Sequence, residues 1–391
     1  FKEKKMLTLQ NNYVKRFDEV DQLIDYCKDE HENVFYLPND GDTFYFAEDN
    51  RIYSTGNTLP HEGCTFTEPG IKAVFTKMGV PGLFPCMMAP NEPDVATNYL
   101  NKLLDDSSIK RNLSNQQFIV DSRKPNNPII GMVSKTYLKY SNHRFLEHFL
   151  IENNNNNLEF TRAFVDNTKM TIKWSEKDFA GIIIDGRPDR VKLGFYSGNS
   201  MIGNATLYFL LSVLDALCTN GVMLPKSIGG SRIVHKGDRI WSGEVENMIN
   251  DTRKSYDRVL KQIENTLNIP FNTDTARIML ENDAPIDIPR DSRVPHKYWT
   301  TKRNFANSSD SAIALQHSIN FVKAIPSKFG GVHTQKIFNS PHRKGNTSMY
   351  HFIGAFTEYA QEQPVREQYR IEEEAGELVN WFDKNSSKFF N

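Results

Sequence analysis

The sequence predicts an α+β protein, in which a central antiparallel β-meander packs on a buried helix between an N-terminal α/β region and a C-terminal helical region. Blocks with the period of a helix alternate along the chain with a block that has the period of a strand. A strongly apolar segment, residues 205–218, follows the strand-like block. The 391 residues are 39% hydrophobic and 24% charged, which is typical of a globular protein with a sizeable core.

The N-terminal α/β region is predicted over residues 1–119. Residues 33–55 alternate aromatic and polar side chains around an Asn-Asp-Gly turn, a pattern that predicts a β-hairpin. Residues 69–105 predict two helices, which prolines interrupt at Pro81 and again near residues 90–93.

The central core is predicted over residues 120–270 and opens with an amphipathic helix at 135–152. The pattern then changes to a period of two, which predicts a three-stranded meander with one apolar face and one face that carries Lys and Tyr. Its strands are expected at residues 168–174, 180–184 and 191–196.

Two further helices complete the prediction for the core. Residues 205–218 are apolar around nearly the whole helical circumference, so this helix is expected to cover the apolar face of the sheet. Gly221 is expected to end it in a left-handed conformation. Residues 243–267 place apolar side chains at helical core spacing. Residues 271–391 are expected to form a basic segment followed by helices.

The central stretch resembles a large family of phage/plasmid-like proteins of unknown function. In that family a Gly-Asn-Ser-type turn precedes a helix that ends in Cys-Thr/Ser-Asn-Gly. The matching residues are Gly198-Asn199-Ser200 and Cys218-Thr219-Asn220-Gly221. Three other segments resemble family segments in the same order along the chain: residues 66–88, 129–150 and 346–376.

The predicted order of elements is also similar to the core of single-strand annealing recombinases of the RecT/Red-beta superfamily. That likeness implies a basic groove along the sheet, assembly into rings or filaments, and annealing in phage or plasmid recombination or replication without ATP. The corresponding groove residues are Lys169, Lys173, Lys192 and Tyr196 in the strands, with Arg187 and Arg190 in a turn.

The segment after the apolar helix adds possible phosphate contacts. A Gly-Gly loop at residues 227–232 offers backbone N–H groups, and it is followed by further cations. The candidate residues are Arg232, His235, Lys236 and Arg239. The alternative is a simple glycine connector between a strand and a helix.

The charge is unevenly distributed, although the net charge is only −1. Residues 1–70 hold 7 Lys and Arg against 14 Asp and Glu, whereas residues 286–345 hold 10 against 3. Aromatic residues interleave with this basic stretch, as in surfaces that follow phosphates and stack bases. The alternative is that the aromatic side chains are core and the charges are solvated.

The sequence favours a protein without catalytic activity and without a cofactor. It contains no GxxxxGK phosphate loop, and its four cysteines form no CxxC pair. Asp283, Asp287 and Asp291 leave a metal-dependent nuclease as an alternative, but Pro285 and Pro289 prevent a regular helix that would align these carboxylates.

The functional prediction is therefore single-stranded nucleic-acid binding and strand annealing, with single-stranded DNA and further copies of the chain as partners. The alternative is a structural or virion-associated assembly protein. No window approaches the roughly 18 apolar residues of a membrane span, and the first residues lack the apolar run of a signal peptide. The expected location is the host-cell cytoplasm, with the virion as alternative.

Overall fold

The computed structural model describes residues 9–10, 14–47, 51–79, 93–153, 157–182, 191–215, 220–224, 230–235, 243–271, 347–350, 353, 357, 360 and 365–389. Helices and strands are both abundant, and the predicted α+β class is confirmed. The chain divides into two compact units. Unit 1 comprises Phe1–Trp174, Ser197–Tyr208 and Arg232–Asn247, and unit 2 comprises Ser175–Tyr196, Phe209–Ser231 and Met248–Asn391.

Each unit draws on several separate segments, whereas the sequence suggested three consecutive regions. The predicted boundary between residues 119 and 120 falls inside a strand, β7 (Gln116–Asp121). The predicted helix over residues 205–218 and the turn before it contribute residues to both units.

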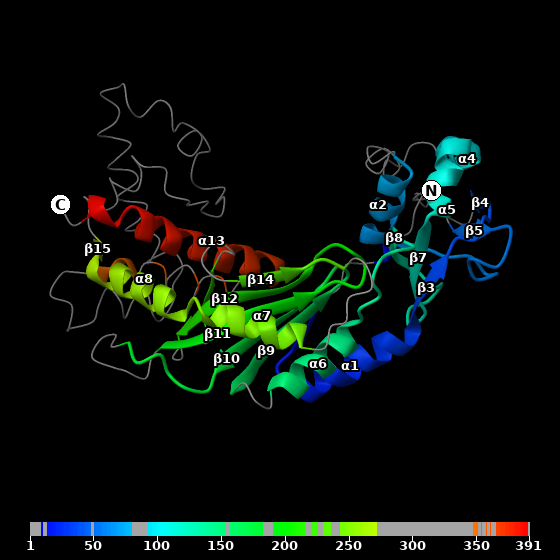
Figure 1. Ribbon diagram of the computed structural model, residues 1–391. Coiled ribbons are helices and arrows are strands. Elements are labelled where there is room, and N and C mark those ends of the chain that lie inside the picture. Colours follow the sequence, from blue (N-terminus) through cyan, green and yellow to red (C-terminus); the bar gives the residue numbers. More distant parts are fainter. Residues whose placement is uncertain are drawn as a thin grey trace, which may run out of the picture. The chain divides into compact units, whose positions relative to one another are not determined.

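Unit 1 contains a five-stranded sheet with the order β1-β6-β8-β7-β3. The pairs β1·β6 and β6·β8 are parallel, and the other two pairs are antiparallel. Three helices pack with these strands into one apolar core (Figure 1). The elements are β1 (Leu9–Gln10), β3 (Val34–Pro38), β6 (Phe66–Thr67), β8 (Ile129–Ser134), α2 (Glu68–Lys77), α4 (Pro93–Asp105) and α5 (Ser107–Ser114).

Helix α2 approaches strand β8 very closely. Thr67 caps the helix by accepting a hydrogen bond from Gly70 N at 3.2 Å. A Cβ atom on Gly70 would lie 1.9 Å from Ile129 O, so only glycine allows this approach.

The hairpin predicted over residues 33–55 is only partly correct. Strand β3 pairs with β7 and not with the next segment of the chain, while β4 (Phe44–Phe46) and β5 (Ile52–Ser54) form the local hairpin. The Asn-Asp-Gly turn does form, with Gly41 at φ 102° and its N–H bonded to Asn39 Oδ1. A turn signal locates a reversal of the chain, but it does not select the strand that pairs afterwards.

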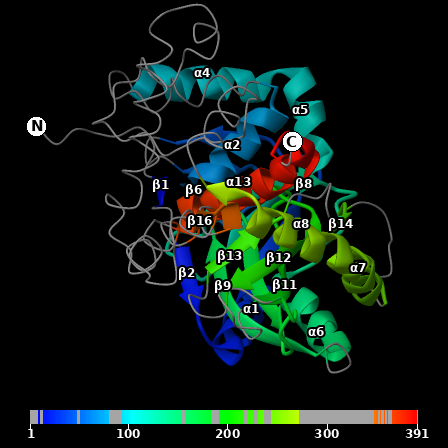
Figure 2. The ribbon, with the colours of Figure 1, turned by 90° about the vertical axis from the view of Figure 1, so that its left-hand side faces the viewer.

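The second sheet has seven strands in the order β13-β12-β11-β10-β9-β2, with β14 paired to β12. In unit 1, helices α1 (Val20–Asn33) and α6 (Asn142–Asn153) lie side by side (Figure 1, Figure 2). The strands are β2 (Val14–Phe17), β9 (Leu158–Asp166), β10 (Met170–Glu176), β11 (Val191–Asn199), β12 (Leu207–Asp215), β13 (Asn220–Met223) and β14 (Gly230–Ile233).

The predicted helix over residues 205–218 is wrong. Leu207–Asp215 form strand β12, and every side chain from Leu207 to Leu214 is buried. A strand that is covered on both faces has the same continuous apolar composition as a buried helix, so the period alone does not separate them. Gly221, expected to end that helix, pairs with Leu214 in strand β13.

The predicted meander is confirmed at two of its three strands. Strands β10 and β11 match residues 168–174 and 191–196. Within the predicted strand at 180–184, residues 180–182 form no strand, although Ala180 N donates to Val191 O at 2.7 Å, and the remainder lies outside the described residues. The additional strand is β9, which directly precedes β10.

The helix predicted over 135–152 begins later than expected, at Asn142. Phe145, Leu146 and Phe149 are buried, as the pattern predicted, but Tyr137 lies before the helix. The interruption predicted at Pro81 and near residues 90–93 falls mainly outside the described residues, between α2 and α4.

Unit 2 contains one apolar core built from strand and helix side chains. The helix predicted over residues 243–267 is confirmed but divided into α7 (Glu244–Arg253) and α8 (Tyr256–Asn268). Helix α13 (Val365–Lys384) runs beside α8 (Figure 1) and packs against β13, where a Cβ on Gly376 would lie 1.9 Å from Met223 O. The remaining elements are β15 (Pro270–Phe271), β16 (Thr347–Ser348) and η2 (Ser386–Lys388).

Candidate functional site

A buried polar network in unit 1 joins residues of the segments 129–150 and 198–200. Gly198 and Asn199, which were expected in a turn, are the last residues of strand β11, and Asn199 Nδ2 donates to Tyr140 O at 2.9 Å and to Asn142 Oδ1 at 3.0 Å. Asn142 Nδ2 then donates to Glu30 Oε2 at 2.7 Å. The turn at the end of β11 is therefore anchored to the start of α6 and to α1.

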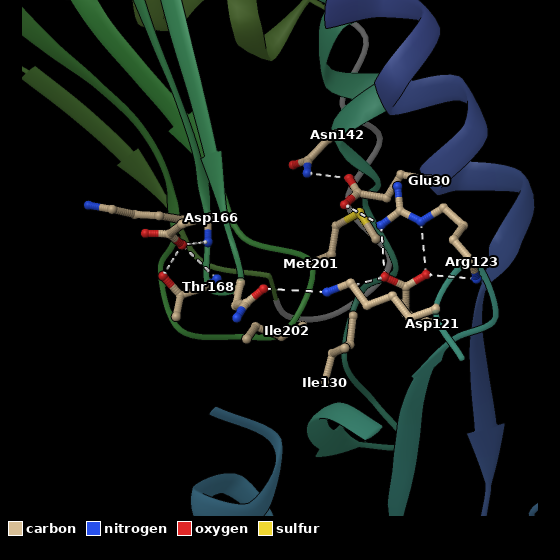
Figure 3. A pocket seen from close by; sticks show the side chains of 12 residues that line it. Glu30, Asp121, Arg123, Ile130, Asn142, Asp166, Thr168, Met201 and Ile202 are labelled. Atoms are coloured by element: carbon tan, nitrogen blue, oxygen red, sulfur yellow. Dashed lines mark hydrogen bonds and ion pairs between the residues drawn. The ribbon is translucent and has the colours of Figure 1, made fainter. Parts of the chain in front are cut away.

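Arg123 holds the other end of this network. Its Nε lies 2.8 Å from Asp121 Oδ1, and its Nη2 lies 3.3 Å from Glu30 Oε1 (Figure 3). Burial raises the pKa of Glu30, although Arg123 and the hydrogen bond from Asn142 favour the ionised form. Burial alone would lower the pKa of Arg123, but its bonds to Asp121 and the nearby acidic groups raise it above its usual range.

Hydrogen bonds from one serine and two tyrosines hold the residues that follow Asn199. Ser200 Oγ donates to Thr168 O at 2.7 Å, while Tyr137 OH donates to Ser200 O at 2.8 Å. Tyr36 OH donates to Met201 O, also at 2.8 Å. These bonds fix the path of the loop. The hydroxyl groups of its sequence and of the two tyrosines satisfy backbone carbonyl groups that need hydrogen-bond partners.

A hollow of about 370 Å³, including the solvent in its mouth, opens beside this network. Figure 3 shows Arg123 between the carboxylates of Glu30 and Asp121, with Asp166 and Thr168 on the opposite side. The lining residues are Glu30, Asp121, Arg123, Lys124, Ile130, Asn142, Asp166, Asn167, Thr168, Lys169, Met201 and Ile202.

The predicted groove residues lie in different environments. Lys169 lines the hollow of unit 1. Lys173 is only 5% exposed and Tyr196 is fully buried, where its OH donates to Glu372 Oε2 of α13. The prediction that these two side chains share an exposed polar face is therefore wrong, because a period of two shows which side chains share a face but not whether another layer covers it.

The candidates around the Gly-Gly loop are also divided. Arg232 is exposed on β14, whereas His235 is buried and stacks on Tyr137 with 5.2 Å between the ring centroids. Burial lowers the pKa of His235, which disfavours the cation that a phosphate contact would need. Arg187, Arg190, Lys236 and Arg239 lie outside the described residues, as does the basic stretch 286–345.

Lys192, which is half-buried, lies beside an exposed aromatic residue in unit 2. Its Nζ lies 5.2 Å from the ring centroid of Phe179, and the Phe179 side chain is 45% exposed. Lys177 and Asp178 are exposed beside it in the chain. We call Lys177, Phe179 and Lys192 the Phe179 platform.

Phe179, Arg123 and Asn142 carry no sequence pattern that predicts the environments in which the structure places them. In the sequence, Phe179 is a single aromatic residue between a charged pair and an apolar run. The same pattern occurs at the end of an ordinary strand. The signal for Asn142 was its place in a family-like segment together with Tyr137 and Tyr140.

No group of three or more His, Cys, Asp or Glu side chains suited to a metal ion occurs among the described residues. Asp283, Asp287 and Asp291, the candidates for a metal-dependent nuclease, lie outside them. Helices in the described part of the chain are all too short or too polar to cross a membrane.

Comparisons with protein-family models, with curated proteins and with solved structures returned no match.

Proposed function

We propose that the protein binds single-stranded nucleic acid through the Phe179 platform and anneals complementary strands without ATP. The observation that carries the proposal is a half-exposed phenylalanine ring with a lysine ammonium 5.2 Å from its centroid. An exposed ring offers a stacking surface to any base, and lysines beside it attract the phosphates that flank that base.

The sequence around the platform supports this assignment. Residues 177–192 hold four basic residues, Lys177, Arg187, Arg190 and Lys192, and three acidic ones, Asp178, Asp185 and Asp189. Of the acidic residues in this segment, Asp178 belongs to the described part of the chain, where it is exposed. These charges leave a formal excess of one positive charge, which weakly favours a polyanion over an apolar partner.

Assembly into a ring or filament belongs to the same proposal. Annealing needs several consecutive nucleotides to be held with their bases accessible, and repeated copies of one small platform supply such a track. Strand β2 ends the strand order of the second sheet, and Val14 is exposed there. Light scattering with and without oligonucleotide measures the number of copies.

The first experiment is an anisotropy titration of a labelled single-stranded oligonucleotide at several salt concentrations, with a duplex of equal length alongside. We expect preference for the single strand and a steep loss of affinity with salt. The substitution Phe179→Ala should weaken binding roughly 5- to 150-fold, since stacking of one base contributes about 1–3 kcal/mol.

The matched control is Tyr99→Ala, which removes a similarly exposed aromatic ring from α4 and should leave affinity unchanged. Lys177→Met with Lys192→Met should reduce the salt slope, by about 0.7 for each lost phosphate contact. Equal affinity of folded Phe179→Ala and wild-type protein would remove the platform from the proposal. Absence of binding even at low salt would favour a structural or virion-associated assembly role.

A strand-annealing assay with two complementary oligonucleotides then tests the second half of the proposal. Faster pairing in the presence of protein, without nucleotide triphosphate, is the expected result. Binding without acceleration would leave a single-strand binding protein and would exclude a role as an annealing protein in phage or plasmid recombination.

A further inference from the structure

The turn that joins β3 to β4 holds an Asp-Gly pair in an exposed position. The Asp40 side chain is 78% exposed, and Gly41 is exposed with φ 102°. No described atom lies within 4 Å of the place that a Cβ on Gly41 would occupy. Since glycine also adopts many backbone conformations, the peptide between these two residues has room to rotate.

Two contacts restrain this pair, and they differ in strength. Asp40 Oδ1 lies 3.3 Å from Lys135 Nζ, in an exposed ion pair that holds the carboxylate only weakly. The N–H of Gly41 donates to Asn39 Oδ1 at 3.0 Å. Asn39 is only 2% exposed, and its own N–H donates to Gln116 O at 3.1 Å, so the acceptor for Gly41 is fixed to the sheet.

We propose that Asp40 is a site of spontaneous covalent modification, at which the Asp40–Gly41 linkage converts to isoaspartate at a rate that Asn39 limits. The Gly41 nitrogen attacks Cγ of the protonated Asp40 carboxyl group and forms a C–N bond, while a Cγ–O bond breaks. The hydroxyl group leaves with the amide proton as water, and a five-membered succinimide ring remains. Because the Gly41 N–H is the reacting group, its hydrogen bond to Asn39 must break first.

The position at which water then opens the ring decides the product. Attack at Cγ restores the aspartate. Attack at the main-chain carbonyl carbon of Asp40 breaks its bond to the Gly41 nitrogen, so that the backbone runs through Cβ and Cγ and the carbonyl becomes the free carboxylate. Only water is released and consumed, so the reaction needs no oxidant and no cofactor.

The described part of the chain holds a second pair of this kind, Asn220–Gly221, in strand β13. Asn220 pairs with Asp215, and Gly221 pairs with Leu214. Ring closure needs a backbone rotation that breaks this pairing, so the fold protects the second pair. In an unfolded chain the order is the reverse, because the neutral amide of asparagine accepts a nucleophile more readily than a carboxylate does. Residues 185–186, also Asp-Gly, lie outside the described residues.

The test incubates the full chain at neutral pH and physiological temperature, in native buffer and in concentrated guanidinium chloride. Peptide mapping by mass spectrometry, with fragmentation that distinguishes isoaspartate from aspartate, follows Asp40 and Asn220 over time. In native buffer we expect isoaspartate at Asp40 before Asn220 loses its amide. In guanidinium chloride Asn220 should react first.

Variants test the part that Asn39 plays. Asn39→Ala removes the acceptor of the Gly41 N–H and should accelerate the reaction at Asp40 roughly 2- to 10-fold, the factor that one hydrogen bond supplies. Asn39→Asp keeps an oxygen acceptor at this position and should react at the wild-type rate. Asp40→Glu is the negative control, because a six-membered ring closes far more slowly. Circular dichroism checks that each variant is folded.

Deamidation of Asn220 before any change at Asp40 in native buffer would overturn the proposal, as would an Asp40 that stays intact throughout. Equal rates in folded Asn39→Ala and in Asn39→Asp would overturn the role of Asn39. The comparison of native buffer with guanidinium chloride uses wild-type protein alone, so it decides the proposal even if Asn39→Ala does not fold. The reaction involves no residue of the Phe179 platform and occurs whether or not the protein binds nucleic acid.

Discussion

The polar network of unit 1 and the Phe179 platform of unit 2 both contain cationic side chains, but these side chains lie in different environments. The Arg123 side chain is only 13% exposed and donates hydrogen bonds to Asp121 and Glu30, whereas Lys192 lies beside the exposed ring of Phe179. The network cation is enclosed by carboxylates, whereas the platform cation lies next to a ring that is exposed to solvent. Substitutions in the network should therefore lower stability, and substitutions in the platform should lower binding.

The largest effect on stability is expected for Arg123→Met. The change leaves the buried carboxylates of Glu30 and Asp121 without their cation, which should cost about 3–5 kcal/mol in the free energy of unfolding. Urea denaturation measures this loss. Arg16→Met, at an exposed pair with Asp18, is the control and should cost less than about 1 kcal/mol.

A smaller loss is expected for Asn199→Ala. The substitution removes the donor to Tyr140 O and Asn142 Oδ1 at a fully buried position, which should cost about 1–3 kcal/mol. Asn33→Ala, which removes an exposed amide at the end of α1, serves as comparison in the same thermal melts. Equal melting temperatures for the two variants would contradict a stabilising role for the Gly-Asn-Ser turn.

The pH dependence of stability should distinguish Glu30 from an exposed carboxylate. Its pKa is raised above the ordinary value of 4.5, chiefly by burial, while Arg123 and Asn142 lower it and Asp121 raises it. A raised folded-state pKa stabilises the fold below the unfolded-state pKa, and this contribution is lost as pH rises through the folded-state pKa. The stability of wild type relative to Glu30→Gln should therefore fall as the pH rises above 4.5.

Paired denaturation curves across that range measure the difference for Glu30. A pH-independent difference between wild type and Glu30→Gln would show that Glu30 has an ordinary pKa in the folded state.

The smallest effect on stability is expected at the Phe179 platform. Phe179→Ala should change the free energy of unfolding by no more than about 0.5 kcal/mol, because its ring is half exposed. The same variant should show the largest loss of oligonucleotide affinity, which anisotropy measures. A large loss of stability would place Phe179 with the network residues and end the contrast between the two regions.

The fold class could be predicted from the sequence because periods of two and of 3.6 residues alternate clearly. The patterns at residues 168–174 and 191–196 predicted strands β10 and β11, and the pattern at 243–267 predicted the helical segment that divides into α7 and α8. The apolar stretch that includes Leu207–Asp215 could not be assigned by this route, because burial on both faces removes the alternation that marks a strand. Which strands pair, as for β3 with β7, depends on contacts distant in sequence.

The candidate site was predictable only in part, and for a related reason. Arg232 is exposed and Lys192 is half-buried, but Lys173 and Tyr196 are enclosed by a layer that strand periodicity does not reveal. The sequence assigned no role to Asn199, and its hydrogen-bond partners are evident only in the structure. No sequence pattern distinguishes Phe179, because the exposure of a single aromatic side chain depends on whether other parts of the fold pack over it.

Helix α13 completes the apolar core of unit 2, although it is synthesised near the end of the chain. Its Leu378, Val379 and Phe382 fill the same core as Val191, Leu211 and Val259, which the ribosome adds more than a hundred residues earlier. Until residues 365–384 emerge, the nascent chain exposes that apolar surface, and unit 2 remains a client for chaperones. A product that ends before residue 365 would lack this helix and should aggregate or be degraded, so premature termination should yield little folded protein even though most of the sequence has been made.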